Sequence, residues 1–324
     1  MSLRPAIVAA ALVAFLLGTA AVSRHSVWGS FTSTTPSSGN TITAASDFRA
    51  PSASESVIAK AAGGLTGAIK KAGTYYVYAN VSDTGNPASG VSTVTANVSS
   101  ITSGSTAVAL AAGSFTAGGV TYNRRSASLT AGSSLAAGSY SYSLTLTDVA
   151  GNSATQSGFG VTVDNTAPSG TDVQTTNGGS IAGRADAGDK IAFTFSGEID
   201  PSSILSGWTG AATNVVVRLN NATNDTVTVF NATNATQLPL GSINLGRSDY
   251  TTANVTFGAT GTASSMVLSG STVTITLGTQ SAAATTAAAS GTMSWTPSAS
   301  ATDAAGNAVS TTAATESGAA DKDF

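Results

Sequence analysis

The sequence predicts an all-β chain of two tandem β-sandwiches that follow an N-terminal signal or anchor helix. Three observations predict this: one apolar segment at the N-terminus, regular alternation of apolar and hydroxyl side chains after it, and two motifs that each occur twice. Successive side chains of a strand point to opposite faces, so the alternation predicts strands with one buried and one solvated face.

The composition indicates a surface of hydroxyl groups. Among 324 residues there are 49 Thr and 47 Ser, while only 9% are charged, against roughly 25% in ordinary globular domains. The formal net charge is -3, and basic residues are adjacent only at Lys70-Lys71 and Arg124-Arg125. Binding to nucleic acid requires clustered Lys and Arg that displace counterions from phosphates. We therefore expect no nucleic-acid partner.

The chain also lacks the residues of the commonest catalytic sites. It has no Cys, and its one His is His25, beside the N-terminal apolar segment. Disulfides, thiolate metal sites and Ser-His-Asp triads are thereby excluded from a mature chain that begins after that residue. Glu198 and Asp200 are spaced to share one face of a strand and to act as an acid and a base, but we expect a structural role for both and predict no enzyme.

Residues 1–29 have the pattern of a signal peptide or signal anchor, and residues 30–50 that of a linker. Arg4 precedes an uncharged run from Pro5 to Ser23, as in the n-region and h-region of a secretory signal. The run is also about as long as the shortest membrane-spanning helices. Both alternatives stay open, and an uncleaved segment would be the only attachment to a membrane.

The stretch Val27-Trp28-Gly29-Ser30-Phe31-Thr32-Ser33-Thr34, followed by Asn40-Thr41-Ile42-Thr43-Ala44, resembles the leader of proteins processed by SipW-type signal peptidases. That group includes camelysin-like and TasA-like biofilm-matrix proteins. The resemblance implies export and a place in an extracellular matrix.

Two motifs divide the remaining chain into residues 51–165 and 166–324. An Ala-Pro-Ser sequence ends at Ser52 and again at Ser169, and proline favours extended backbone at such a boundary. Turn-forming Asp-x-Ala-Gly-Asn sequences at 148–152 and 303–307 fall near the end of each part. Each is predicted to join the last two strands of its domain.

The strands themselves recur at the spacing of a β-sandwich. Ser202-Ser203-Ile204-Leu205, after Pro201, is predicted to form one short helical turn, and residues 281–289 a loop. The predicted strands are 75–82, 91–98, 106–110, 120–124, 126–129, 139–148 and 159–163 in the first part, and 190–196, 214–219, 226–230, 253–257, 272–277 and 291–295 in the second.

Both parts resemble bacterial immunoglobulin-like domains. In the first, the resemblance rests on the alternating run from Tyr140 to Asn152 and on Val161-Thr162-Val163-Asp164-Asn165-Thr166-Ala167-Pro168. In the second, it rests on the run from Gly188 to Pro201. It implies tandem immunoglobulin-like sandwiches of a cell-surface or matrix protein, without catalytic residues.

One metal site is predicted at the domain junction. Asp83, Asp148, Asp164 and Asn165 supply the oxygen ligands that Ca²⁺ prefers. The alternative is that these side chains hydrogen-bond their own turns. No other cofactor is expected.

The predicted function is that of a non-enzymatic, exported surface or extracellular-matrix protein with a structural or adhesive role. Its partners would be further copies of itself, joined through strand edges, or components of the cell wall or matrix. The alternative is a carbohydrate- or ligand-binding module, for which exposed rings at Trp208 or Trp295 would be the evidence.

Overall fold

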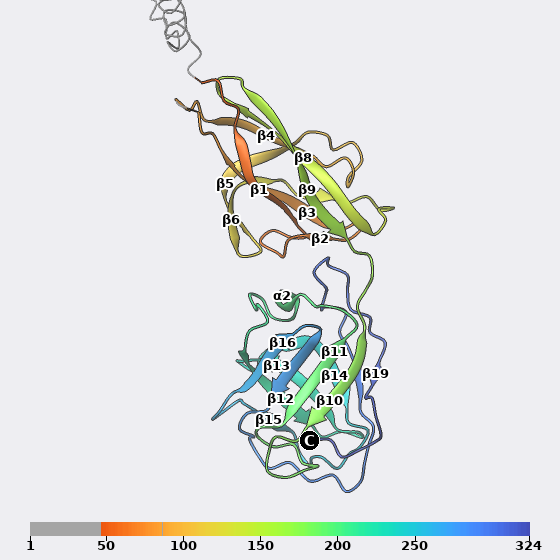
Figure 1. The fold of residues 1–324 in the computed structure, drawn as a ribbon. Helices are drawn as coiled ribbons and strands as arrows, with labels where there is room; N and C mark the ends of the chain where they lie inside the picture. The colour runs from red at the N-terminus through yellow and green to blue at the C-terminus, as the bar shows by residue number, and fades with distance from the viewer. Residues whose placement is uncertain (1–46, 86) are drawn as a thin grey trace, which may run out of the picture. The chain divides into compact units, whose positions relative to one another are not determined.

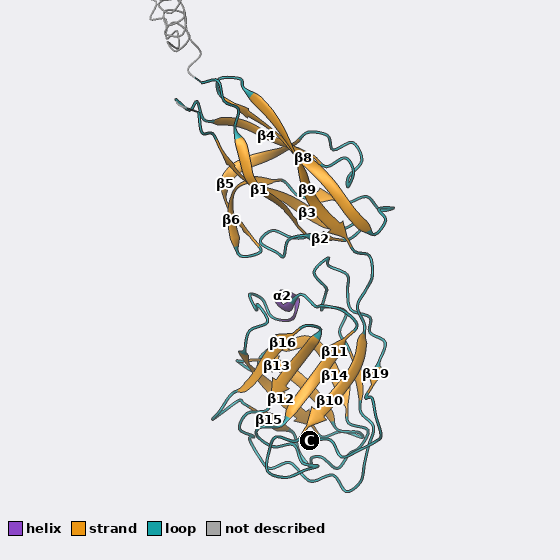
Figure 2. Ribbon diagram, in the orientation of Figure 1, coloured by secondary structure: helices purple, strands orange, loops and turns teal. Residues whose placement is uncertain are grey.

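The computed structural model describes residues 47–85 and 87–324, and these form strands and loops almost throughout (Figures 1 and 2). The one helix among them is the short α2 (Pro201–Ile204). The predicted signal or anchor segment lies outside the described residues. Within the described residues, no helix is long and apolar enough to span a membrane.

The first sandwich consists of strands that pair in the order β1-β3-β6-β5-β4-β8-β9-β2, with β7 pairing to β3. All pairs are antiparallel except β2 with β9, and β5 pairs with both β6 and β4, so it connects the two layers. The strands are β1 (Ser52–Ala59), β2 (Ala68–Ile69), β3 (Thr74–Ser82), β4 (Val91–Asn97), β5 (Val108–Ala117), β6 (Val120–Ser126), β7 (Leu129–Thr130), β8 (Gly138–Asp148) and β9 (Ser153–Val163).

The predicted alternation is confirmed in β8, where Tyr142, Leu144 and Leu146 are buried and the serine and threonine residues between them reach the surface. Facing residues of β3, including Tyr75 and Val77, complete the core. Strand β1 was not predicted, because Ser-Ala-Ser-Glu-Ser has no apolar period. It forms because its backbone pairs with β3 along most of its length.

The open side of the first sandwich is bridged by a side chain. Gln156 on β9 accepts a hydrogen bond from the backbone N–H of Ala53 on β1 at 2.5 Å. This bond ties the edge strand of one layer to the edge region of the other, and it occupies one of the backbone groups that a strand from another chain would need.

The second sandwich pairs its strands in the order β10-β11-β17-β16-β12-β13-β14-β18-β19, with β15 pairing to β12. The strands are β10 (Gly170–Thr176), β11 (Lys190–Phe195), β12 (Thr213–Asn220), β13 (Thr226–Asn231), β14 (Gln237–Asn244), β15 (Val255–Phe257), β16 (Ser264–Ser269), β17 (Thr272–Thr276), β18 (Ser294–Thr296) and β19 (Ala314–Thr315).

Trp295 is central to the core of the second sandwich. Its ring is fully buried and meets Phe193 and Phe195 edge-on, with ring centroids 5.2 and 4.9 Å away. Its indole N–H donates to the carbonyl of Leu240 at 2.6 Å. Gly170 passes so close to the ring that a Cβ there would lie 2.8 Å from it. The position of β10 therefore requires glycine at its first residue.

The predictions of a short helical turn after Pro201 and of a loop at residues 281–289 are confirmed. Helix α2 begins after Asp200, whose carboxylate accepts the N–H of Ser202, and residues 281–289 contain neither helix nor strand. In the second sandwich, β10, β14, β16 and the two-residue β19 were not predicted. Each has weak alternation, and β14 contains Pro239.

We predict that Trp295→Ala lowers the free energy of unfolding of the second sandwich by about 3–5 kcal/mol, because it removes a large buried side chain and leaves a cavity. Chemical denaturation monitored by a probe in each sandwich measures this. Val267→Ala, at an exposed position of β16, is the control and should change the free energy by less than about 0.5 kcal/mol. Equal effects of the two substitutions would contradict the assignment of Trp295 to the core.

Candidate functional site

Two of the four predicted calcium ligands lie together, and a third carboxylate that was not predicted joins them. Asp47, Asp83 and Asp148 each place an oxygen atom within 4.8 Å of the others. Asp47 precedes β1, Asp83 follows β3, and Asp148 ends β8. The three carboxylates therefore meet at the end of the first sandwich where the chain enters it.

Backbone and amide N–H groups occupy every oxygen of this cluster. Asp47 accepts from the N–H groups of Arg49 and Ser89, both at 2.9 Å, and these bonds lower its pKa. Asp83 accepts from Gly85 and Gly90. Such bonds offset the repulsion between the charges and fix the surrounding turns. The geometry thus supports the turn-capping alternative, while leaving the oxygens' second lone pairs for a cation.

Asp164 and Asn165 do not belong to this cluster. They follow β9, whose last residue pairs with Gly138 at the start of β8, whereas Asp148 ends β8. The length of an eleven-residue strand, on the order of 35 Å, separates the two ends. Asn165 instead accepts from the N–H of Lys71 at 2.8 Å and donates to the carbonyl of Leu135 at 3.0 Å.

The Asp-x-Ala-Gly-Asn turn of the first sandwich holds the segment that enters it. Asn152 donates its backbone N–H and its side-chain amide to the two carboxylate oxygens of Asp148, both at 2.7 Å. The same amide donates to the carbonyl of Asp47 at 3.1 Å. We call this arrangement the entrance closure: the asparagine at the end of the turn bonds both the aspartate that begins the turn and a backbone carbonyl of the segment that enters the sandwich.

The second sandwich has the same entrance closure. Asn307 donates its N–H and its amide to Asp303, both at 2.8 Å, and its amide also donates to the carbonyl of Asp164 at 3.0 Å. In both sandwiches the accepting carbonyl lies four residues before a proline, Pro51 or Pro168. In both, the entrance aspartate also accepts the N–H of the residue two positions on, at 2.9 Å.

Sequence reasoning identified the two motifs of the entrance closure but not their contact. The turn was interpreted as a hairpin and the Ala-Pro-Ser sequence as a boundary. The identical spacing Asp-x-x-Ala-Pro at 47–51 and 164–168, each paired with one Asp-x-Ala-Gly-Asn turn, was the available signal. Asp47, Asn152 and Asn307 were therefore missed as site residues.

Glu198 and Asp200 do not form an acid-base pair. Glu198 is exposed, whereas Asp200 is 3% exposed. The carboxylate of Asp200 caps α2 through Ser202 and forms an ion pair with Lys60 at 2.8 Å. The hollow that Glu198 helps to line does not include Asp200.

The two tryptophans of the ligand-binding alternative are core residues. Trp208 and Trp295 are 6% and 0% exposed, and the indole N–H of each donates to a backbone carbonyl. Neither ring is available to stack on a sugar. The Tyr140 hydroxyl donates to the carbonyl of Ala136 at 3.1 Å, a bond that stabilises the start of β8.

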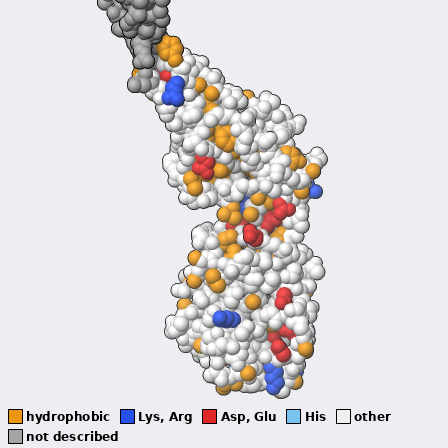
Figure 3. Space-filling model, viewed as in Figure 1, with side chains coloured by type: hydrophobic (Ala, Val, Ile, Leu, Met, Phe, Trp, Pro, Cys, Tyr) orange, Lys and Arg blue, Asp and Glu red, His pale blue; other side chains and the backbone are white. Residues whose placement is uncertain are grey.

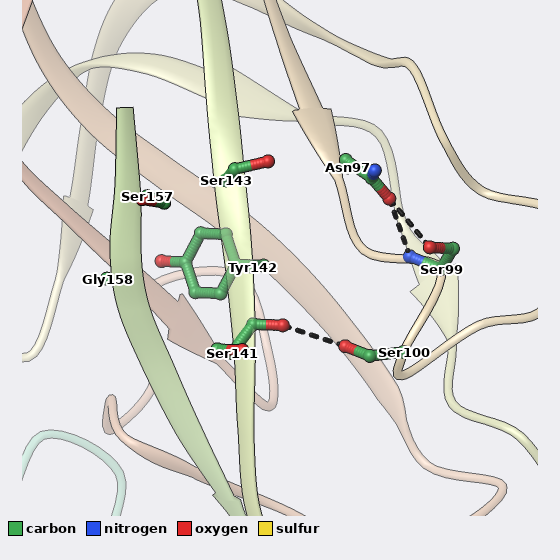
Figure 4. Close-up of a pocket in the computed structure, with 8 residues that line it drawn as sticks. All are labelled: Asn97, Ser99, Ser100, Ser141, Tyr142, Ser143, Ser157 and Gly158. Carbon is green, nitrogen blue, oxygen red and sulfur yellow. Dashed lines mark hydrogen bonds between the residues drawn. The ribbon is translucent and has the colours of Figure 1, made fainter. Parts of the chain in front are cut away.

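A shallow hollow of about 260 Å³ lies where β9 bulges beside β8 (Figure 4). Ser100 donates to the carbonyl of Ser141 at 2.8 Å, and Asn97 accepts from the N–H and the hydroxyl of Ser99. These groups form a polar, uncharged lining. The lining residues are Asn97, Ser99, Ser100, Ser141, Tyr142, Ser143, Ser157 and Gly158.

The visible surface of the described residues matches the composition. In the view of Figure 3, a few charged side chains, in red and blue, lie on a surface that is mostly white, the colour of the backbone and of uncharged polar side chains. Large exposed hydrophobic side chains are few and come from separate segments, as with Phe48, Val120 and Val149.

Comparison with known families bears on the first sandwich. Residues 78–165 match the family model of the bacterial Ig-like domain. The match runs from the middle of β3 to the linker that follows β9. Together with the nearly all-β architecture, it supports the predicted immunoglobulin-like fold. Comparison with curated proteins gives no match.

We predict that Asn152→Ala and Asn307→Ala each lower the free energy of unfolding of their own sandwich by about 1–3 kcal/mol, because each leaves one carboxylate oxygen and an entrance carbonyl without a donor. Denaturant unfolding of the full chain measures the loss. Asn177→Ala, at an exposed position, is the matched control. An effect no larger than that of the control would contradict the role of the entrance closure.

The sequence-based calcium prediction is tested by thermal unfolding with millimolar Ca²⁺ or with EDTA. A ligand bound only by the folded state raises the melting temperature. If Asp83 and Asp148 bind Ca²⁺, the shift seen in the native chain disappears in Asp83→Asn and persists in Asp164→Asn. Equal melting temperatures with Ca²⁺ and EDTA would leave only the turn-capping role.

Proposed function

We propose that the protein is a non-enzymatic, exported cell-surface or extracellular-matrix protein with a structural or adhesive role. Its two immunoglobulin-like sandwiches, residues 51–165 and 166–324, would act as tandem domains that space or present other groups. The all-β architecture and the match of residues 78–165 to the bacterial Ig-like domain support a surface or structural module.

The observation that carries this proposal is the repeated entrance closure. Both sandwiches secure the segment that enters them with the same Asp-Asn pair, the same backbone carbonyl and the same spacing to a proline. Fixing the chain where it enters a domain suits a protein that connects domains in series. A catalytic domain places its polar groups around a pocket instead.

The roles of the acidic residues support the non-enzymatic part of the proposal. Asp148, Asp303 and Asp200 use their carboxylates to hold turns or a helix end. Asp225 likewise accepts the backbone N–H groups of Tyr250 and Thr251. Carboxylates held in this way stabilise loops, and structural hydrogen bonds account for their positions.

The proposals of export and of binding partners are supported by the amino-acid sequence. The n-region and h-region of residues 1–29 and the resemblance to SipW-type leaders support secretion. The hydroxyl-rich, weakly charged surface gives little electrostatic repulsion between copies. We therefore propose self-association or contact with wall and matrix components, with membrane attachment only through an uncleaved N-terminal segment and with no nucleic-acid partner.

A carbohydrate-binding function is the second candidate, and one observation favours it. The serine-lined hollow of Figure 4 offers hydroxyl and amide groups of the kind that bind sugar hydroxyls. The buried positions of Trp208 and Trp295 remove the stacking surface on which this alternative first depended.

The proposed function predicts that the protein is recovered from culture fluid or the cell surface with a processed N-terminus near Ser30, in particles heavier than the 31.5 kDa chain. N-terminal sequencing and sedimentation of each cell fraction measure this. A chain that begins at Met1 and is confined to the cytosol would overturn export. A processed monomer that binds a polysaccharide, and loses binding in Ser143→Trp, would favour the second candidate.

A further inference from the structure

The C-terminal segment Gly318–Phe324 is docked into the second sandwich by specific bonds. The carbonyl of Asp321 accepts the N–H of Gly291 at 2.8 Å, and that of Phe324 accepts the N–H of Gly183 at 2.6 Å. The N–H of Phe324 donates to the hydroxyl of Thr175 on β10 at 3.0 Å. The last two residues are 1% and 4% exposed. The segment is therefore part of the packed structure.

An Asp-Tyr pair is the centre of this docking. The hydroxyl of Tyr250 donates to the Asp323 carboxylate at 3.0 Å and accepts the N–H of Asp323 at 2.8 Å. Thr175 approaches the other carboxylate oxygen at 3.4 Å. The Phe324 ring packs edge-on against Tyr250, with centroids 6.0 Å apart. Tyr250 is itself fully buried.

The charges around Asp323 disfavour its ionised form. Glu316 and Asp321 each place a carboxylate oxygen within 4.8 Å of Asp323 and of each other. Among the described residues, Asp323 forms no ion pair. Burial first, and then Glu316 and Asp321, raise its pKa from 3.8 to about 7.

The other charged groups nearby are engaged elsewhere. Asp249, next to Tyr250, is paired with Arg247 at 2.6 Å. The methylene groups of Lys322 face Gly183. On β10, Asp172 accepts from Gln174 and Ser317. Arg184, which follows Gly183, pairs with Asp186 at 3.4 Å. In the part of the chain that the structure describes, no basic side chain is therefore paired with the Asp323 carboxylate.

We propose that Gly318–Phe324 is a pH-dependent latch, closed on the second sandwich while Asp323 is protonated and loosened when it ionises. Ionisation leaves a buried negative charge between two further carboxylates, with Tyr250 as its one strong donor. Release of the segment hydrates the charge and exposes Phe324 and Tyr250.

The direction of the pH dependence follows from proton linkage. The docked form holds the proton up to about pH 7, whereas the released form loses it near its ordinary pKa of 3.8. Docking is therefore fully favourable below about pH 4. It weakens by up to about tenfold per pH unit up to about pH 7, and is then constant.

Amide hydrogen exchange in EDTA between about pH 4 and pH 8 tests the latch. After correction for intrinsic rates, protection of Gly183, Asp323 and Phe324 should fall at least tenfold as the pH rises. The amide of Leu277, bonded to Asp189 at 2.8 Å, is the reference and should stay protected. Constant protection of the three latch amides would overturn the proposal.

Two variants and one direct titration complete the test. Asp323→Asn mimics the neutral carboxyl and should keep the segment protected at every pH. Asp321→Asn removes one nearby carboxylate and should lower the pKa of Asp323, so that protection falls by a smaller factor between about pH 4 and pH 8 than in the native chain. If Asp323→Asn fails to fold, carboxyl-carbon NMR of the native chain decides: titration of Asp323 near 7 supports the latch, and titration near 4 refutes it.

Discussion

One hydrogen bond at each entrance, from an asparagine amide to a backbone carbonyl, holds the segment that leads into the first strand of each sandwich. The amide nitrogens of Asn152 and Asn307 make this bond and also donate to the carboxylate of an aspartate in the same turn. The carbonyl lies four residues before a proline, and β1 and β10 begin one and two residues after that proline. These strands then pair with β3 and β11 and form one edge of each sandwich.

Buried aspartates extend the same principle to the loops. Eight aspartates of the described residues are buried, although charged residues make up only 9% of the chain. Asp189, for example, accepts three backbone N–H groups, from Gly178, Gly179 and Asp186. A carboxylate that accepts several backbone N–H groups stabilises a loop whose N–H groups have no partner in a helix or sheet. Much of the negative charge is therefore internal, and the surface is left to serine and threonine. Asp323 is the exception, because carboxylates surround it and backbone donors do not.

The sequence predicted the strands whose two faces differ strongly in polarity. In β8 and β17, apolar and hydroxyl residues alternate without interruption, and both strands appear at the predicted places. Strand β1 begins with five small or polar residues, and β14 contains a proline, so neither carries that signal. Their conformation depends on hydrogen bonds to β3 and to β13, and such pairing leaves no pattern in the side chains of the strand itself.

By itself, the sequence determined the all-β class, the hydroxyl surface and the two turns that end with Asn152 and Asn307, because alternation and turn preferences are local properties. Only the tertiary structure decided which carboxylates meet. Asp148 and Asp164 are close in the sequence, yet strand β9 places them at opposite ends of the first sandwich. Asp47 and Asp148 are a hundred residues apart, yet they share one cluster because β1 and β8 have their ends at the same entrance. Strand length and register decide such contacts, and neither is a property of any single segment.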